Sequence, residues 1–193
     1  MRAMHVTDEV LGLFAARGGN TYAESVSMEQ HALQAAALAR AAGAPDALVL
    51  AALLHDVGHF LDEPDSEFGV TDHGTSGGAW LAERFVAAVS EPVRLHVEAK
   101  RFRCFVDPGY EDELSPASVG TLKLQGGPMS TAEAEAFEAE PFAADALAVR
   151  SFDDGGKVPG LEIPALDGWR PLLDAAEFRR CCLLYTSPSP RDS

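Results

Sequence analysis

The feature that most constrains the fold is a short apolar run that ends in an ionisable pair. Residues 47–54 read Ala-Leu-Val-Leu-Ala-Ala-Leu-Leu, and His55 and Asp56 follow directly. A helix formed by this run is apolar on every side, so other elements of the fold must bury it. The His-Asp pair then enters the interior, where it is costly unless it is satisfied, and a metal ion satisfies both side chains.

Helical periodicity and capping residues dominate the rest of the chain, and no convincing strand alternation is visible. Ser27 with Gln30, and Ser130 with Glu133, match the capping box that opens helices. The expected helices cover residues 7–18, 27–43, 47–57, 72–89, 90–103, 115–126, 131–140 continuing over 143–152, and 171–180. We therefore predict an all-α bundle of about eight helices, with loops over 62–67 and 154–168.

Composition narrows the class of protein further. The 193 residues are enough for one compact domain, and 47% hydrophobic residues supply its core. The net charge of −15 argues against nucleic acid or a membrane surface as a partner. No apolar run approaches the length of a membrane span, and residues 1–10 do not resemble a signal peptide. Three cysteines in no spaced pattern suit a reducing compartment, so we expect a cytoplasmic protein.

The last residues of the chain do not read as part of the domain. The string from Cys182 to Ser193 corresponds to one frame of a common transposon sequencing adapter, which predicts read-through at the end of a gene fragment. The alternative is a natural tail rich in serine and proline. We assign residues 1–181 to a single domain and leave 182–193 out of the predicted fold.

Further histidines fall on or beside the predicted helices, where a helical scaffold can direct several of them into one site. The candidate donors are His31, His55, Asp56, His59, His73, His96 and Asp153. Their nitrogen and oxygen atoms are enough for two metal ions, and Asp56 can bridge both through its two carboxylate oxygens. Such donors suit iron, and they would also suit Mn or Zn. The alternative is a set of separate surface or hydrogen-bonded histidines.

These residues lie in stretches that resemble the HD-domain superfamily, and more narrowly its mixed-valent di-iron oxygenases. Those enzymes cleave the carbon–phosphorus bond of hydroxyphosphonates, and the 2-amino-1-hydroxyethylphosphonate dioxygenases are the most similar type. The His-Asp pair occurs in all HD proteins, whereas His-Val-x-Ala-Lys at 96–100 and Gln-Gly-Gly at 125–127 are more specific. The matching stretches are residues 24–31, 55–60, 68–73, 96–101, 114–118, 124–127 and 150–157.

The resemblance implies two iron ions, Fe(II) and Fe(III). The ligands that it implies for the first ion are His31, His55, Asp56 and Asp153, and those for the second are His73 and His96, with Asp56 bridging. Positions that contact the substrate's phosphonate match Lys100, Ser118, Thr121 and Arg150.

His59 and Glu24 match positions beside the ligands or at the amine end of the substrate, and with Lys100 and Tyr22 they complete the candidate catalytic set. In one relative of this kind, a tyrosine three residues before the glutamate can cap an iron ion until substrate arrives. Here Tyr22 lies two residues before Glu24, which departs from that pattern.

The implied reaction uses dioxygen to convert a small 1-hydroxyphosphonate into a carboxylate and phosphate. Lys100 follows His96 by four residues, so both lie on one helix face and the ammonium can reach a phosphonate at the metal. Two alternatives remain open. One is a metal-dependent phosphohydrolase acting on a phosphate ester or nucleotide, which needs no redox step. The other is a metal-stabilised binding module without turnover.

Overall fold

The computed structural model describes the backbone of residues 5–183 and the side chains of residues 5–176. Over this part of the chain there are helices and connecting loops but no strand, which confirms the predicted all-α class. The α-helices number ten where about eight are expected, and two short 3-10 helices join them. They are α1 (Val6–Arg17), α2 (Met28–Ala41), α3 (Asp46–Leu54), η1 (Val57–Phe60), α4 (His73–Ala82), α5 (Ala87–Val106), α6 (Tyr110–Glu113), α7 (Pro116–Leu124), α8 (Thr131–Glu138), α9 (Ala143–Gly155), η2 (Leu166–Trp169) and α10 (Arg170–Leu183).

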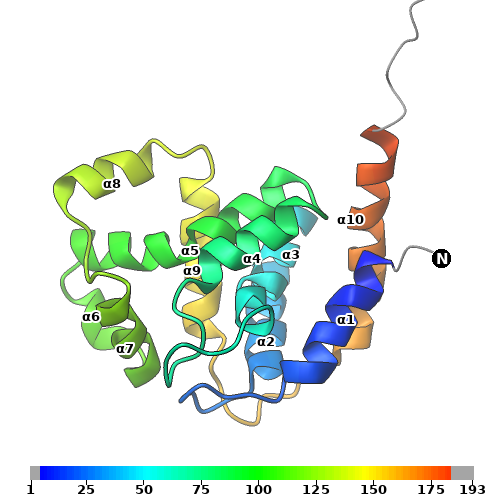
Figure 1. Ribbon diagram of the computed structural model, residues 1–193, viewed down its shortest axis with the longest axis horizontal. Coiled ribbons are helices and arrows are strands. Elements are labelled where there is room, and N and C mark those ends of the chain that lie inside the picture. Colours follow the sequence, from blue (N-terminus) through cyan, green and yellow to red (C-terminus); the bar gives the residue numbers. More distant parts are fainter. Residues whose placement is uncertain (1–4, 184–193) are drawn as a thin grey trace, which may run out of the picture.

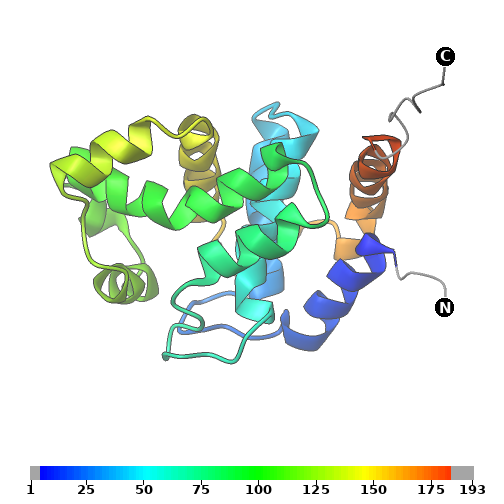
Figure 2. The same ribbon diagram turned by 45° about the horizontal axis from the view of Figure 1, so that its top comes forward.

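The helices are arranged around the long helix α5. It packs against α3, α4, α8 and α9, while α2 packs against α3 and α9. α1 and α10 lie together at one edge of the molecule, and α6, α7 and α8 lie at the opposite edge (Figures 1 and 2). The central helices α2, α3, α4, α5 and α9 therefore enclose the interior from several sides.

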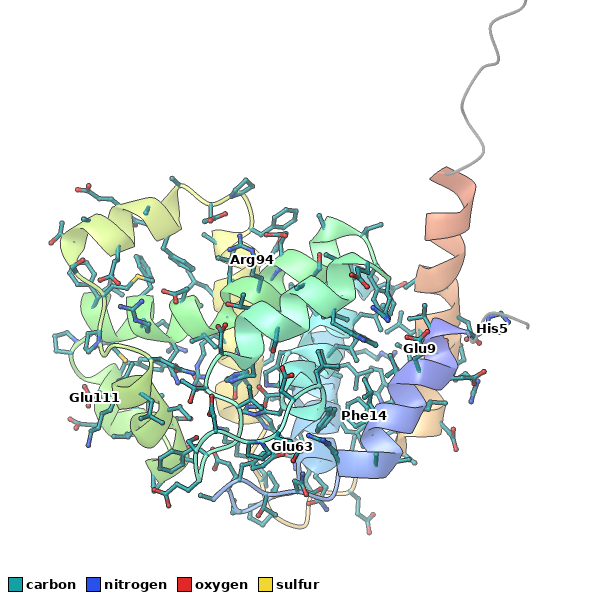
Figure 3. All side chains as sticks on the ribbon, viewed as in Figure 1. His5, Glu9, Phe14, Glu63, Arg94 and Glu111 are labelled. Carbon is teal, nitrogen blue, oxygen red and sulfur yellow. The ribbon has the colours of Figure 1, made fainter. Side chains whose placement is uncertain are left out.

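Helix α3 occupies the interior, as its all-round apolar sequence predicts. Each residue from Val49 to Leu54 is at most 2% exposed. Full burial of a leucine side chain contributes about 2 kcal/mol, so this helix anchors the largest hydrophobic cluster. Within that cluster Phe14 of α1, which is labelled in Figure 3, meets Phe60 edge-on, with ring centroids 5.0 Å apart.

The expected helix over 47–57 ends earlier, at Leu54, and the tight 3-10 turn η1 follows. Within η1, Gly58 meets the first residue of α4 so closely that a Cβ there would lie 2.0 Å from the carbonyl oxygen of His73. Only a residue without a side chain permits this approach. The turn therefore brings the residues after α3 against the start of α4.

The boundary between α4 and α5 differs from the expected helices over 72–89 and 90–103. Helix α4 ends at Ala82, a turn follows, and α5 begins at Ala87 with Pro92 inside it. The missing N–H of Pro92 removes one intrahelical hydrogen bond. Burial of Val89 and Val93, at 1% and 0% exposure, compensates on the same helix. Asp72 precedes α4 but makes no side-chain cap hydrogen bond.

Capping residues predict helix starts correctly elsewhere. Both expected capping boxes are present, with Ser27 accepting from the backbone of Gln30 and Ser130 from that of Glu133. Ser115 likewise accepts from the backbone N–H of Ser118 and starts α7. The short helix α6 has no counterpart among the expected elements.

The termini complete the description. Helix α10 extends beyond the expected 171–180, and most of the suspected read-through segment, residues 184–193, lies outside the described residues. In the described part of the chain, no helix combines the length and the hydropathy needed to cross a membrane.

Candidate metal centre

Four buried histidines meet at the centre of the helices, and the backbone orients each of them. The Nδ1–H of His55 donates to the carbonyl of Ala52 at 2.8 Å, and that of His31 to the carbonyl of Gly156 at 2.9 Å. His73 and His96 donate to carbonyls three residues earlier, at 2.8 and 2.7 Å. Because a carbonyl can only accept, Nδ1 carries the proton in each ring, and Nε2 is left to face the interior as a metal ligand would.

His31, His55 and Asp153 form what we call the first donor group. His31 comes from α2, His55 follows α3, and Asp153 lies in the last turn of α9. The Nε2 atom of His31 lies 3.2 Å from Asp153 Oδ1, and that of His55 lies 3.9 Å from the same oxygen. Three elements that are distant in sequence thus converge on one point.

His73 and His96 form the second donor group. His73 is the first residue of α4, and His96 lies in the middle of α5. Their Nε2 atoms lie 3.1 Å apart. Both rings are buried, at 6% and 2% exposure.

Asp56 stands between the two donor groups and turns one oxygen to each. Its Oδ2 lies 3.4 Å from Nε2 of His55 and 3.6 Å from Nε2 of His31. Its Oδ1 lies 3.4 Å from Nε2 of His73 and 3.7 Å from Nε2 of His96. A carboxylate placed in this way can join two ions.

The donor atoms fit metal ions by their chemistry as well as by position. The Nε2 atoms of His31 and His55 lie 3.1 Å apart, as do those of the second donor group. With Nδ1 protonated, two neutral rings would turn lone pairs toward each other, so each pair of Nε2 atoms needs a cation between them, either a proton or a metal ion. Two nitrogens that each lie about 2.1 Å from one ion, at neighbouring coordination positions, would be separated by a distance close to the 3.1 Å between these Nε2 atoms. A cation between the rings resolves this repulsion.

The pKa values of His55 and Asp56 also indicate that the cluster favours a bound positive charge. Burial lowers the pKa of His55, but Asp56 and Asp153 outweigh burial and raise that pKa to about 9. Burial tends to raise the pKa of Asp56, yet His55 and His96 hold it well below its usual value. A proton therefore stays at His55 at neutral pH, and metal binding would displace it.

His59 lies beside the second donor group with a different tautomer. Its Nδ1 accepts a hydrogen bond from the backbone N–H of Val70 at 2.9 Å, so in the neutral ring the proton is on Nε2. The ring stacks on His73 with centroids 4.0 Å apart. Burial lowers the pKa of His59 to about 4, so the ring is a neutral hydrogen-bond donor at pH 7.

A cavity of about 60 Å³ opens beside the donor groups, and cationic side chains line it. Lys100 is 3% exposed, and its ammonium donates to Thr121 Oγ1 at 2.7 Å. Burial, with Arg150 nearby, lowers the pKa of Lys100 to about 7. The predicted substrate residue Ser118 also lines the cavity, and its backbone carbonyl accepts from Thr121.

Arg150 lines the same cavity, but its guanidinium is already engaged. It donates to the carboxylates of Asp153 and Asp154, and its Nε donates to the hydroxyl of Tyr110 at 2.8 Å. Burial opposes ionisation of Asp153, but Arg150 and Lys157 hold its pKa well below the usual value. Arg150 therefore orients an acidic donor, while the resemblance implies a contact with phosphonate.

Glu24 is likewise paired within the protein. Its Oε1 accepts from Lys157 Nζ at 2.7 Å and from Ser115 Oγ at 2.7 Å. Lys157 also donates to Ser118 Oγ at 3.0 Å and lies 3.8 Å from Asp153 Oδ1. The carboxylate expected at the amine end of a substrate thus already holds a lysine.

Tyr22 lines the cavity, and the hydrogen bond of its hydroxyl is to a residue outside both donor groups. The hydroxyl accepts from Asn20 Nδ2 at 3.0 Å, and the ring lies against His59 with centroids 5.3 Å apart. Tyr22 and Ala23 both have positive φ, at 42° and 65°, which is uncommon for residues with a Cβ. Backbone strain of this kind collects at functional sites.

Sequence reasoning did not single out two residues of this site. Lys157 appears there only as the end of a matching stretch, and Tyr110 belongs to the unexpected helix α6. Lys157 lies four residues after Asp153, a helical spacing that could have indicated a shared face. No local pattern reveals Tyr110, because its contact with Arg150 joins residues 40 apart.

A His-Asp pair and further histidines meet at the core of this all-helical fold. Such an arrangement is typical of a class of metal-dependent proteins, and comparison with known families identifies that class. The profile of the HD domain family matches residues 28–123. The chain belongs to the HD domain family, and its His/Asp cluster places side chains together that could hold a metal ion.

Two curated relatives cover most of the chain. Hydroxymethylphosphonate dioxygenase of Gimesia maris is 47% identical over 163 residues, which is 82% of this chain and 81% of the relative. The 1-hydroxy-2-(trimethylamino)ethylphosphonate dioxygenase (glycine-betaine-forming) of Leisingera caerulea is 38% identical over 178 residues, which is 88% of this chain and 89% of the relative. Within the HD family, the chain is thus similar to dioxygenases.

Proposed function

We propose that the chain is an HD-family oxygenase that cleaves the carbon–phosphorus bond of a small 1-hydroxyphosphonate with dioxygen. One substrate and one dioxygen yield one carboxylate, one phosphate and one proton, so atoms and charge balance. Both curated relatives are named phosphonate dioxygenases, which favours this reaction over phosphate-ester hydrolysis. The substrate is a small molecule, and the acidic chain has no nucleic acid or membrane partner.

The cofactor in this proposal is a pair of iron ions. The first donor group would hold one ion and the second donor group the other, with Asp56 bridging. Iron supplies the redox chemistry that activates dioxygen. The observation that carries the proposal is the position of Asp56, with its two oxygens facing different histidine pairs at 3.4 to 3.7 Å.

The chain's own residues bind and orient the substrate. Lys100 donates to Thr121 across the cavity, so its ammonium can turn to a phosphonate oxygen at little cost in position. Ser118 offers a hydroxyl donor to the same group, and Thr121 would offer its own in exchange for its hydrogen bond to the Ser118 carbonyl. Arg150 adds positive charge from behind Asp153 and keeps that donor in place. His59 offers its Nε2–H to the site while its Nδ1 is held by the backbone.

Phosphate release with and without dioxygen tests the proposal. The chain is loaded anaerobically with ferrous iron and supplied with hydroxymethylphosphonate, and phosphate, formate and oxygen uptake are measured together. We expect phosphate only after dioxygen is admitted, in equal amount to the oxygen consumed. Phosphate release that proceeds equally well without dioxygen would instead identify a phosphohydrolase.

We also propose that residues 1–181 are one HD domain, that residues 182–193 are not native, and that the protein is cytoplasmic. The single cysteine of the described side chains, Cys104, is buried and unpaired, which is compatible with a reducing compartment. Inspection of the codons for residues 182–193 tests the origin of the tail, because adapter DNA has a fixed sequence.

A further inference from the structure

Tyr110 is a buried tyrosine that the proposed reaction does not use. It follows a tight turn directly after α5, in which its backbone N–H donates to the carbonyl of Asp107 at 3.1 Å. Asp107 followed by Pro108 is typical of such a turn, because the proline ring presets its φ. The turn directs the tyrosine side chain into the protein, where it is 2% exposed and packs with Cys104 of α5 and Leu122 of α7.

The hydroxyl of Tyr110 lies between Arg150 and Asp154 and bonds to both. It accepts from Arg150 Nε at 2.8 Å and donates to Asp154 Oδ2 at 2.6 Å. The direction of both bonds is fixed, because a guanidinium can only donate and a carboxylate can only accept. Burial raises the pKa of Tyr110 above its usual value, so the hydroxyl keeps its proton at neutral pH. The hydroxyl is therefore a fixed link between the two charged groups.

Arg150 is held at three of its nitrogen atoms. Nε donates to Tyr110 and Nη2 to Asp154, while Nη1 donates to Asp153 of the first donor group. A planar guanidinium that is held at Nε and Nη2 cannot turn without breaking one of those two bonds. The direction of Nη1 is fixed in this way, and Nη1 is the atom that orients the Asp153 carboxylate.

We infer that Tyr110 is a positioning residue for the metal ion at the first donor group, and that it acts through Arg150 on Asp153. The inference rests on the metal centre of the proposed function and adds to it a residue of α6, a helix that supplies no donor. Without the hydroxyl, the buried Nε of Arg150 would lack its acceptor, which is costly, so the guanidinium would shift to regain one. Asp153 would then lose its fixed orientation, and ligands whose partners are lost bind metal less tightly.

Tyr110→Phe tests the inference, because it removes the hydroxyl and keeps the ring. Competition of ferrous iron against a chelator, without dioxygen, gives a Kd for each of two binding steps, and the tighter step belongs to the group with more protein donors. We expect that Kd to rise about tenfold, the lower end of the range typical for residues that orient a ligand. Ser151→Ala is the matched control. It removes an exposed hydroxyl of α9 that donates to the carbonyl of Leu147, and it should leave both Kd values unchanged.

A double-mutant cycle separates positioning from packing. In an Arg150→Lys background no guanidinium joins Tyr110 to Asp153, so Tyr110→Phe should change the Kd of the tighter step by less than about twofold. Val10→Ala controls for stability. Val10 is buried in α1, at the edge of the molecule opposite α6 (Figures 1 and 2). This variant should lower the melting temperature and leave both Kd values unchanged.

Two results would overturn the inference while the proposed function stands. One is an unchanged Kd in Tyr110→Phe. The other is a rise by the same factor with and without Arg150→Lys, because Tyr110 would then act through packing alone. Chelator competition needs no turnover. If phosphate release proves independent of dioxygen, the proposed function fails, and the same Kd values still decide whether Tyr110 positions the metal ligand.

Discussion

The two donor groups on either side of Asp56 are built differently. The first has three residues, His31, His55 and Asp153, and Arg150 holds its aspartate from behind. The second consists of His73 and His96, with His59 stacked on His73, and it borders the cavity that Lys100 lines. With Asp56 added to both, the first group offers four donor residues and the second offers three.

This difference teaches where chemistry can take place. A metal ion surrounded by protein ligands is structural in character, whereas an ion with open positions can bind a substrate. We therefore expect the ion at the first donor group to be held tightly and the ion at the second to receive the substrate. The predictions below test that division, beginning with the residue that the two groups share.

Asp56→Ala should have the largest effect, because it removes an oxygen donor from both groups at once. We expect neither ion to be retained and turnover to fall by about three orders of magnitude or more. Metal analysis by mass spectrometry, together with phosphate release, measures both. Retention of two metal ions per chain would refute the bridging role.

Comparison of His31→Ala with His96→Ala tests whether the two donor groups differ in how tightly they hold a metal ion. His31→Ala should lose the tightly held ion, whereas His96→Ala should keep it and lose only the more weakly held ion. Metal content and iron spectroscopy after anaerobic purification distinguish the two. If both variants lose metal to the same extent, the two groups do not differ in the way that we propose.

Arg150→Lys should weaken the first donor group more moderately. A lysine keeps the charge but cannot contact Asp153, Asp154 and Tyr110 together as the guanidinium does. Loss of a residue that orients a ligand typically costs about 10- to 100-fold in metal affinity. Chelator competition measures this. Arg103→Lys serves as a matched control, because Arg103 contacts Asp154 without contacting Asp153.

The smallest effect is a pH dependence on the cavity side. With a pKa near 7, Lys100 is an ammonium below pH 7 and loses its charge above it, whereas an ordinary lysine stays charged to about pH 10. KM for the phosphonate should therefore rise by up to about tenfold per pH unit above 7. In Lys100→Arg this rise should be reduced to the part caused by titration of the substrate. Identical KM profiles for both proteins would contradict the role of Lys100.

Local signals in the sequence account for much of the fold. Ser27 and Ser130 start their helices through hydrogen bonds to residues only three positions away, so a pattern of neighbours suffices. Pro92 misleads for the opposite reason. It resembles a helix start, but the burial of Val89 and Val93 against distant helices continues α5 on both sides of it. Contacts between helices that are distant in the sequence cannot be predicted from a short stretch of residues.

The candidate site divides in the same way. Residue type and the family resemblance predict the donor residues, and the structure brings all of those histidines and aspartates together. The partners of those residues were not foreseen. Lys157 and Glu24 are 133 residues apart in the sequence. Their contact depends on how the end of α9 meets the segment before α2. Their catalytic roles remain predictions.

The backbone carbonyls that hold the four histidines have a consequence for how an acidic protein attracts a dianion. Carbonyl partners orient the rings without adding formal charge, so Asp56 and Asp153 bring the only two negative charges among the donors. Two divalent or trivalent cations would exceed them. With both ions bound, the centre would carry a net positive charge that attracts a dianion. Water and salt screen the net charge of −15 on the chain beyond about 8 Å, so it opposes this attraction little.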